Sequence, residues 1–167
     1  MTFRLAHISD IHLGPLPKVR RRELFSKRIT GYINWKRNRA RHMAGDTLES
    51  LVAAMQKAAP DHVAVTGDLT NLALDAEIEA AADWLESIGD PARVSAVPGN
   101  HDAYVPGALG RAVKAWRPYM SNEAPAIVKT GSGFPFLRER GPVAIIGVNS
   151  AIATGPFMAS GVFSQHQ

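Results

Sequence analysis

The chain contains no cysteine, and this absence removes several kinds of chemistry at once. Disulfide bonds, thiolate zinc sites and cysteine nucleophiles are excluded, which leaves His, Asp, Glu and Asn as the side chains able to hold a metal ion. The sequence also lacks an apolar run long enough to cross a membrane, and its start, MTFRLAHISD, lacks the basic and apolar regions of a signal peptide. We therefore expect a cytoplasmic protein.

Acidic residues are nearly absent from one segment. Residues 18–41 hold ten of the nineteen Lys and Arg residues and one acid, Glu23, so the net charge of +4 arises locally. The apolar residues between Arg21 and about Arg41 recur at roughly helical spacing, which predicts a basic amphipathic helix with Gly31 as a possible kink. Two interpretations remain open: a cap whose apolar stripe packs on the domain, or a segment that binds an anionic membrane surface or nucleic acid, which would make the protein peripheral to the membrane in the lipid case.

Elsewhere, short apolar runs alternate with helical patterns. Strands are expected over residues 3–9, 62–66, 93–97 and 142–148, and helices over 46–59, 75–88 and 109–116, with a hairpin over 126–140. A strand, helix, strand, helix, strand order implies parallel pairing through right-handed crossovers. The 167 residues and 46% hydrophobic content suit one globular α/β domain.

Three short polar motifs each follow a predicted strand: D-I-H at 10–12, G-D at 67–68 and G-N-H-D at 99–102. Open α/β sheets bind ligands beyond the carboxyl ends of their strands, so these motifs can converge at one edge. Asp10 and His12 are two residues apart, which in an extended segment places both side chains on the same side. Asp68 offers two carboxylate oxygens that can bridge two cations.

The third motif contains three adjacent side chains suited to metal binding or catalysis. Asn100 offers a neutral carbonyl ligand, His101 offers an imidazole whose ordinary pKa is near neutrality, and Asp102 can orient that ring. Alone, Asp-x-His and Gly-Asp are common turn sequences, whereas three such motifs in this order are specific.

The motifs resemble the calcineurin-like metallophosphoesterase family, whose pattern is D-x-H, then G-D, then G-N-H-[DE]. The resemblance covers about residues 3–150, and the stretches HISDIHLG, VAVTGDLTN and VPGNHDAY are similar to bacterial members near the cyclic-nucleotide phosphodiesterase branch. It implies a metallophosphoesterase-type α/β sandwich with parallel strands, crossover helices and a basic helical insertion at about residues 16–44.

The resemblance also implies two divalent metal ions, which would be manganese, iron or zinc, and a phosphate ester substrate. Asp10 and His12 would hold the first ion, Asp68 would bridge both, and Asn100 would hold the second. A metal-activated water would attack phosphorus in line.

The same resemblance assigns the catalytic residues. His101 would contact the phosphate or protonate the leaving oxygen, and Asp102 would hold its ring. A phosphodiesterase is the first expectation. A lipid pyrophosphatase at the membrane, a nuclease and a non-catalytic binding module on the same scaffold are the alternatives.

The family pattern continues with a histidine after a later strand and then a G-H-x-H element. Beyond His101 this chain has one histidine, His166, which lacks that context. We therefore expect residues 1–167 to form a single incomplete domain that carries the N-terminal half of the site. The second ion would have few ligands, so hydrolysis by this chain alone should be weak or absent.

Overall fold

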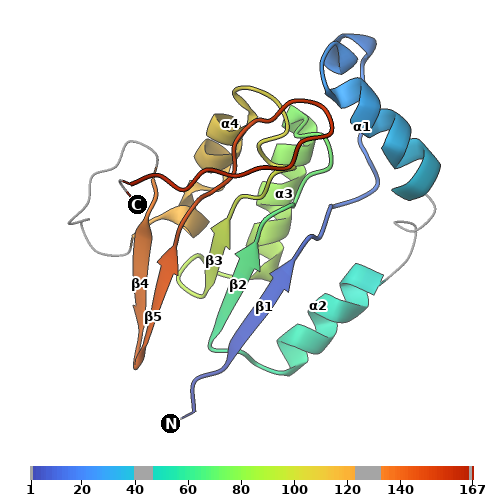
Figure 1. Cartoon of the computed structure of the whole chain (residues 1–167). Helices are drawn as coiled ribbons and strands as arrows, with labels where there is room; N and C mark the ends of the chain where they lie inside the picture. The colour runs from blue at the N-terminus through green and yellow to red at the C-terminus, as the bar shows by residue number, and fades with distance from the viewer. Residues whose placement is uncertain (1, 40–46, 123–132, 166) are drawn as a thin grey trace.

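A parallel three-stranded sheet forms the centre of the protein (Figure 1). The computed structural model describes residues 2–39, 47–122, 133–165 and 167. The sheet has the order β1-β2-β3 and consists of β1 (Leu5–Ser9), β2 (His62–Thr66) and β3 (Val94–Val97). These strands lie where the sequence predicts them, and the expected α/β class with parallel pairing is confirmed.

Helices connect and cover these strands. The helices are α2 (Thr47–Lys57), α3 (Asp75–Ile88), α4 (Ala108–Ala115) and the 3-10 turn η3 (Arg117–Met120). In Figure 1, α3 lies behind the sheet while α2 lies beside β1. Residues 40–46 lie outside the described residues, and so does the predicted opening of α2 at Asp46.

The main core fills the space between the sheet and α3. Val65, Leu69 and Leu85 are completely buried, and so is the Trp116 side chain, whose indole N–H donates to the Ile78 carbonyl oxygen at 2.9 Å. Burying a large apolar side chain stabilises the fold by about 1.5–3 kcal/mol. The sheet is therefore a rigid platform for the loops that leave its carboxyl edge.

A second, antiparallel sheet consists of β4 (Phe136–Arg140) and β5 (Val143–Gly147). The strand expected over residues 142–148 is confirmed, but the hairpin lies later than the predicted range 126–140, part of which is outside the described residues. The buried Arg138 guanidinium fastens the hairpin to the first sheet, because it donates to the Val94 carbonyl oxygen at 2.6 Å.

The basic segment is helical but divided. It consists of the 3-10 turn η1 (Arg21–Leu24), the α-helix α1 (Arg28–Asn34) and the π-helical turn η2 (Trp35–Arg39). Three of its predicted stripe residues are exposed, namely Phe25, Ile29 and Ile33, so the interpretation that the stripe packs on the domain is wrong for them. No helix among the described residues is long and apolar enough to span a bilayer.

Candidate metal centre

The loops that follow β1 and β2 run side by side at the carboxyl edge of the sheet. The His12 N–H donates to the Asp68 carbonyl oxygen at 2.8 Å, and the Leu13 N–H donates to the Leu69 carbonyl oxygen at 2.8 Å. These bonds extend the pairing of β1 with β2 beyond the strands themselves. The first two motifs therefore lie together, as the sequence predicts.

The backbone at this edge is unusual. Asp10, His12 and Asp68 all have left-handed φ angles, of 54°, 44° and 54°. Such conformations cost non-glycine residues of order 1–3 kcal/mol each and cluster at functional sites. The strained backbone at the turn from strand to loop therefore fixes the direction of these three side chains.

Glycine is required where the second and third motifs meet. A Cβ atom on Gly99 would lie 2.2 Å from the Asp68 Oδ1 atom and 2.5 Å from the Asp68 backbone nitrogen. Because no side chain intervenes, the His101 N–H reaches Asp68 Oδ1 at 2.8 Å. Close backbone approach thus joins the G-D and G-N-H-D loops and orients the Asp68 carboxylate.

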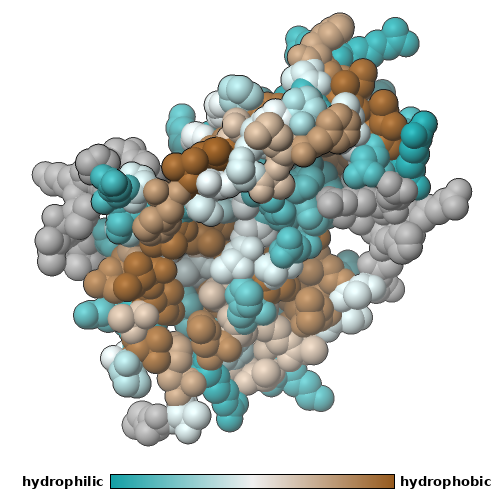
Figure 2. All heavy atoms as spheres, in the orientation of Figure 1, coloured by the Kyte–Doolittle hydropathy of each residue, from teal (hydrophilic) through white to brown (hydrophobic). Residues whose placement is uncertain are grey.

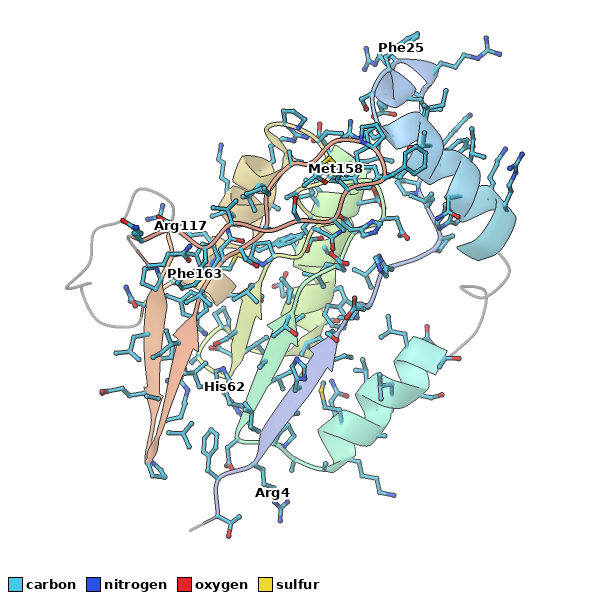
Figure 3. The ribbon with its side chains drawn as sticks, in the orientation of Figure 1. Arg4, Phe25, His62, Arg117, Met158 and Phe163 are labelled. Atoms are coloured by element: carbon cyan, nitrogen blue, oxygen red, sulfur yellow. The ribbon has the colours of Figure 1, made fainter. Side chains whose placement is uncertain are left out.

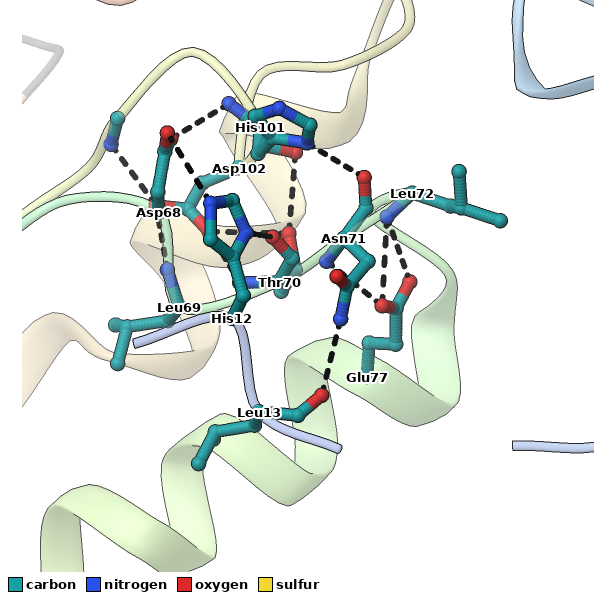
Figure 4. A network of polar contacts seen from close by, with 11 residues as sticks. His12, Leu13, Asp68, Leu69, Thr70, Asn71, Leu72, Glu77, His101 and Asp102 are labelled. Carbon is teal, nitrogen blue, oxygen red and sulfur yellow. Dashed lines mark hydrogen bonds and ion pairs between the residues drawn. The ribbon is translucent and has the colours of Figure 1, made fainter. Parts of the chain in front are cut away.

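Three side chains form a compact group of possible ligands (Figure 4). One ligand atom each from His12, Asp68 and His101 lies within 4.8 Å of the others. His12 Nε2 is 3.9 Å from Asp68 Oδ2, and the two imidazole rings meet edge to face at a centroid distance of 4.7 Å. A carboxylate oxygen with two imidazoles is a donor set that zinc, iron and manganese accept.

Backbone carbonyls orient both imidazoles. His12 Nδ1 is 3.0 Å from the Thr70 carbonyl oxygen, and His101 Nδ1 is 2.7 Å from the Asn71 carbonyl oxygen. A carbonyl oxygen can only accept, so each Nδ1 carries a proton, and Nε2 of the neutral ring carries the lone pair. Metal-ligating histidines are held in this way, which means that the site fits a divalent cation.

Two further predicted ligands line a cleft beside this group. Asp10 and Asn100 line an open cleft of about 280 Å³ together with Asp68, and Ser150 and residues 159–161 form another part of its wall. Asp10 is exposed and is not a member of the compact group. The structure therefore brings all four predicted ligands to one edge, but it places His101, rather than Asp10, next to His12 and Asp68.

The predicted role of Asp102 is wrong. Its carboxylate does not hold the His101 ring: it accepts hydrogen bonds from the backbone N–H groups of Thr70 at 2.9 Å and Gly99 at 2.8 Å, and from the Thr70 hydroxyl at 3.0 Å. Asp102 is completely buried, and this burial raises its pKa to about 6, against the lowering effect of those bonds. Asp102 therefore ties the loop after β2 to the loop after β3.

Sequence reasoning missed the residues that support the site. Thr70 and Asn71 act through backbone carbonyls, which no side-chain motif reveals. Glu77 is buried in the first turn of α3 and accepts from the Asn71 N–H at 2.7 Å (Figure 4). It also accepts from the Leu74 N–H at 3.0 Å. An acid in the first turn of a predicted helix was the available signal for that contact.

Comparison with known protein families matches residues 3–151 to the calcineurin-like phosphoesterase family, Metallophos. No similar sequence was found among curated proteins. The family consists of phosphoric ester hydrolases that typically bind divalent metals, and the match includes every residue of the site described above. The chain belongs to the calcineurin-like phosphoesterase family.

Proposed function

We propose that this chain is a metal-dependent hydrolase of phosphate esters, with phosphodiesters as its substrate class. In this proposal Asp10, His12, Asp68 and Asn100 hold two divalent ions, which are manganese, iron or zinc. The proposal includes the expectation that residues 1–167 belong to a single metallophosphoesterase domain with a basic helical insertion at about residues 16–44.

The compact group of His12, Asp68 and His101 is the observation that carries this proposal. Both rings donate from Nδ1 to a backbone carbonyl, so both Nε2 atoms serve as ligands or proton carriers without a change of tautomer. Asp68 is nine-tenths buried, and the His101 N–H directs its carboxylate. A charged group at that depth needs a compensating partner, which a cation provides.

The residues of the proposed site have distinct roles in hydrolysis. The divalent ions held at this edge would supply Lewis-acid chemistry, by lowering the pKa of water and offsetting charge on phosphoryl oxygens. In its imidazolium form His101 protonates the leaving oxygen from Nε2 and returns to the neutral ring with its proton on Nδ1, while the Asn71 carbonyl and the stacked Tyr104 ring, with a centroid distance of 5.3 Å, keep the imidazole in place. The cleft beside Asp10 and Asn100 receives the phosphate.

Manganese titration by calorimetry tests the metal site. We expect saturable binding that Asp68→Asn weakens by at least about 100-fold, because the bridging carboxylate is lost. Asp83→Asn, a change of equal charge on the exposed face of α3, is the control and should bind as the wild type does. Absence of saturable binding, or binding that Asp68→Asn leaves intact, would overturn the proposal.

Hydrolysis of bis(p-nitrophenyl) phosphate tests the chemistry. We expect a slow, manganese-dependent rate that Asp68→Asn abolishes. His101→Ala should lower this rate by about 100-fold or more while it leaves most of the manganese affinity, because general acid catalysis typically contributes 10²–10⁴-fold. Equal losses of rate and affinity would instead assign His101 to the ligand shell.

A further inference from the structure

The segment from η1 to η2 has an inner face that anchors it to the domain. The Arg28 guanidinium donates to the Leu72 carbonyl oxygen at 2.8 Å and also to the Ala73 carbonyl oxygen. A Cβ atom on Gly31 would lie 2.7 Å from a Leu72 methyl carbon and 2.4 Å from the Tyr104 hydroxyl, so α1 approaches the domain as closely as glycine allows. The segment is therefore held in a defined orientation.

The outer face of the segment carries an apolar stripe. Ile29 and Ile33 lie one turn apart on α1 and are 50% and 43% exposed, and Phe25, in the turn between η1 and α1, is 88% exposed. Figure 2 shows hydrophobic atoms bordered by hydrophilic ones over α1, and Figure 3 shows Phe25 at the outer end of the segment, directed away from the sheet. Exposed apolar stripes of this kind mark interaction surfaces.

Positive charge lies at both ends of the stripe. Arg21 and Arg22 precede Phe25, and Lys36 and Arg37 follow Ile33 by one turn; all four are exposed. The single acid of residues 18–41, Glu23, accepts from the Arg20 backbone N–H at 2.6 Å and is partly buried. The outer face therefore combines apolar side chains with a local excess of positive charge.

We propose that this outer face docks on an anionic lipid surface. Phe25, Ile29 and Ile33 would enter the boundary between headgroups and acyl chains, while the flanking Arg and Lys residues contact anionic headgroups. Nucleic acid fits less well, because aliphatic side chains at the centre of the face offer bases no stacking partner. Charge complementarity and the central apolar side chains together favour an anionic lipid surface over nucleic acid as the partner.

Vesicle flotation tests the docking. The 167-residue chain is mixed, in the presence of EDTA, with vesicles of phosphatidylcholine alone or of phosphatidylcholine with phosphatidylglycerol. We expect binding to the anionic vesicles only, and weaker binding as salt rises. Because EDTA removes metal, the result is independent of the proposed hydrolase activity.

Two pairs of matched variants locate the surface. Phe25→Ser should weaken vesicle binding by about tenfold, whereas Phe163→Ser, which removes a 60% exposed ring far from α1 (Figure 3), should not. Arg21→Gln with Arg22→Gln should weaken it by about 20-fold, whereas Lys114→Gln with Arg117→Gln changes the net charge equally and should have little effect. All these side chains are exposed, so unchanged melting curves are expected to accompany the binding changes.

Several outcomes would overturn the docking. These are equal binding to both kinds of vesicle, no binding to either, or equal losses in the test and control variants. Salt-sensitive binding to duplex DNA without vesicle binding would identify nucleic acid as the partner. Concentration-dependent dimers that Phe25→Ser abolishes, again without vesicle binding, would identify a second copy of the chain.

Discussion

The two ends of the three-stranded sheet use histidine in opposite ways. At the amino end, His62 is completely buried, with Nε2 2.8 Å from the Ser95 hydroxyl and Nδ1 accepting from the Arg140 guanidinium at 3.2 Å. At the carboxyl end, His12 and His101 use Nδ1 on backbone carbonyls, His12 Nε2 is 3.9 Å from Asp68 Oδ2, and His101 offers a ring nitrogen within 4.8 Å of the same carboxylate. The two kinds of histidine therefore differ in their partners. The structural His62 contacts a hydroxyl and a guanidinium, whereas each candidate ligand contacts a backbone carbonyl and lies near a carboxylate.

The backbone conformation also differs between the two ends of the sheet. Left-handed φ angles occur at Asp10, His12 and Asp68, where the chain leaves the sheet. In contrast, His62 begins a regular strand and is paired in register with Leu5. Ala59, which precedes β2, is also left-handed with a φ of 47°, so what distinguishes the carboxyl end is that its left-handed residues carry candidate ligand side chains.

The largest effects are expected from removing one histidine at each end of the sheet. We expect His12→Ala to lower manganese affinity by about 10–100-fold with little effect on unfolding, because a ligand of the proposed site is lost. His62→Ala should instead destabilise the fold by about 2–4 kcal/mol, through a cavity and unpaired buried polar groups, and leave metal affinity unchanged. Calorimetric titration and urea unfolding measure the two effects. Similar behaviour of both variants would remove the distinction.

Asp102→Ala removes a structural residue that lies at the carboxyl end of the sheet. Removal of its carboxylate leaves the Thr70 and Gly99 N–H groups without their acceptor, so we expect a loss of about 2–3 kcal/mol of stability. Urea unfolding provides the measurement. A variant as stable as the wild type that differs only in the pH dependence of hydrolysis would restore the original assignment of Asp102 as the partner of His101.

Gly99→Ala tests the close approach of the second and third loops. The added Cβ atom would meet Asp68 Oδ1 at 2.2 Å, so the carboxylate or the loop must move. We expect a loss of about 1–3 kcal/mol of stability together with weaker manganese binding. Gly110→Ala is the control, since nothing lies within 4 Å of a Cβ atom there. Unchanged manganese affinity in Gly99→Ala would show that Asp68 tolerates the displacement.

The smallest effect is expected for Thr70→Val. Its hydroxyl lies 3.0 Å from Asp102 Oδ1 and 3.1 Å from the His101 carbonyl oxygen, while the Thr70 carbonyl that orients His12 is retained. We expect about 1 kcal/mol of destabilisation and unchanged metal affinity. A large loss of affinity would mean that the hydroxyl, rather than the carbonyl, supports the site.

Local patterns in the sequence were sufficient for most of the framework. The strand over residues 62–66 and the helix over 75–88 have the predicted bounds, because apolar periodicity and the flanking Pro60 and Gly89 are properties of neighbouring residues. The three motifs were recognisable for the same reason: each is a short string placed after a strand. Their convergence at one edge followed from parallel pairing.

The secondary-structure elements and the side chains able to bind a cation were predictable from the sequence, because both depend on neighbouring residues. Three findings required the folded structure: Asn71 rather than Asp102 holds His101, Asp102 joins two loops, and the Phe25 side chain is exposed. Each of these findings depends on contacts between segments far apart in the chain or on backbone carbonyl groups. Local sequence patterns predict neither kind of interaction.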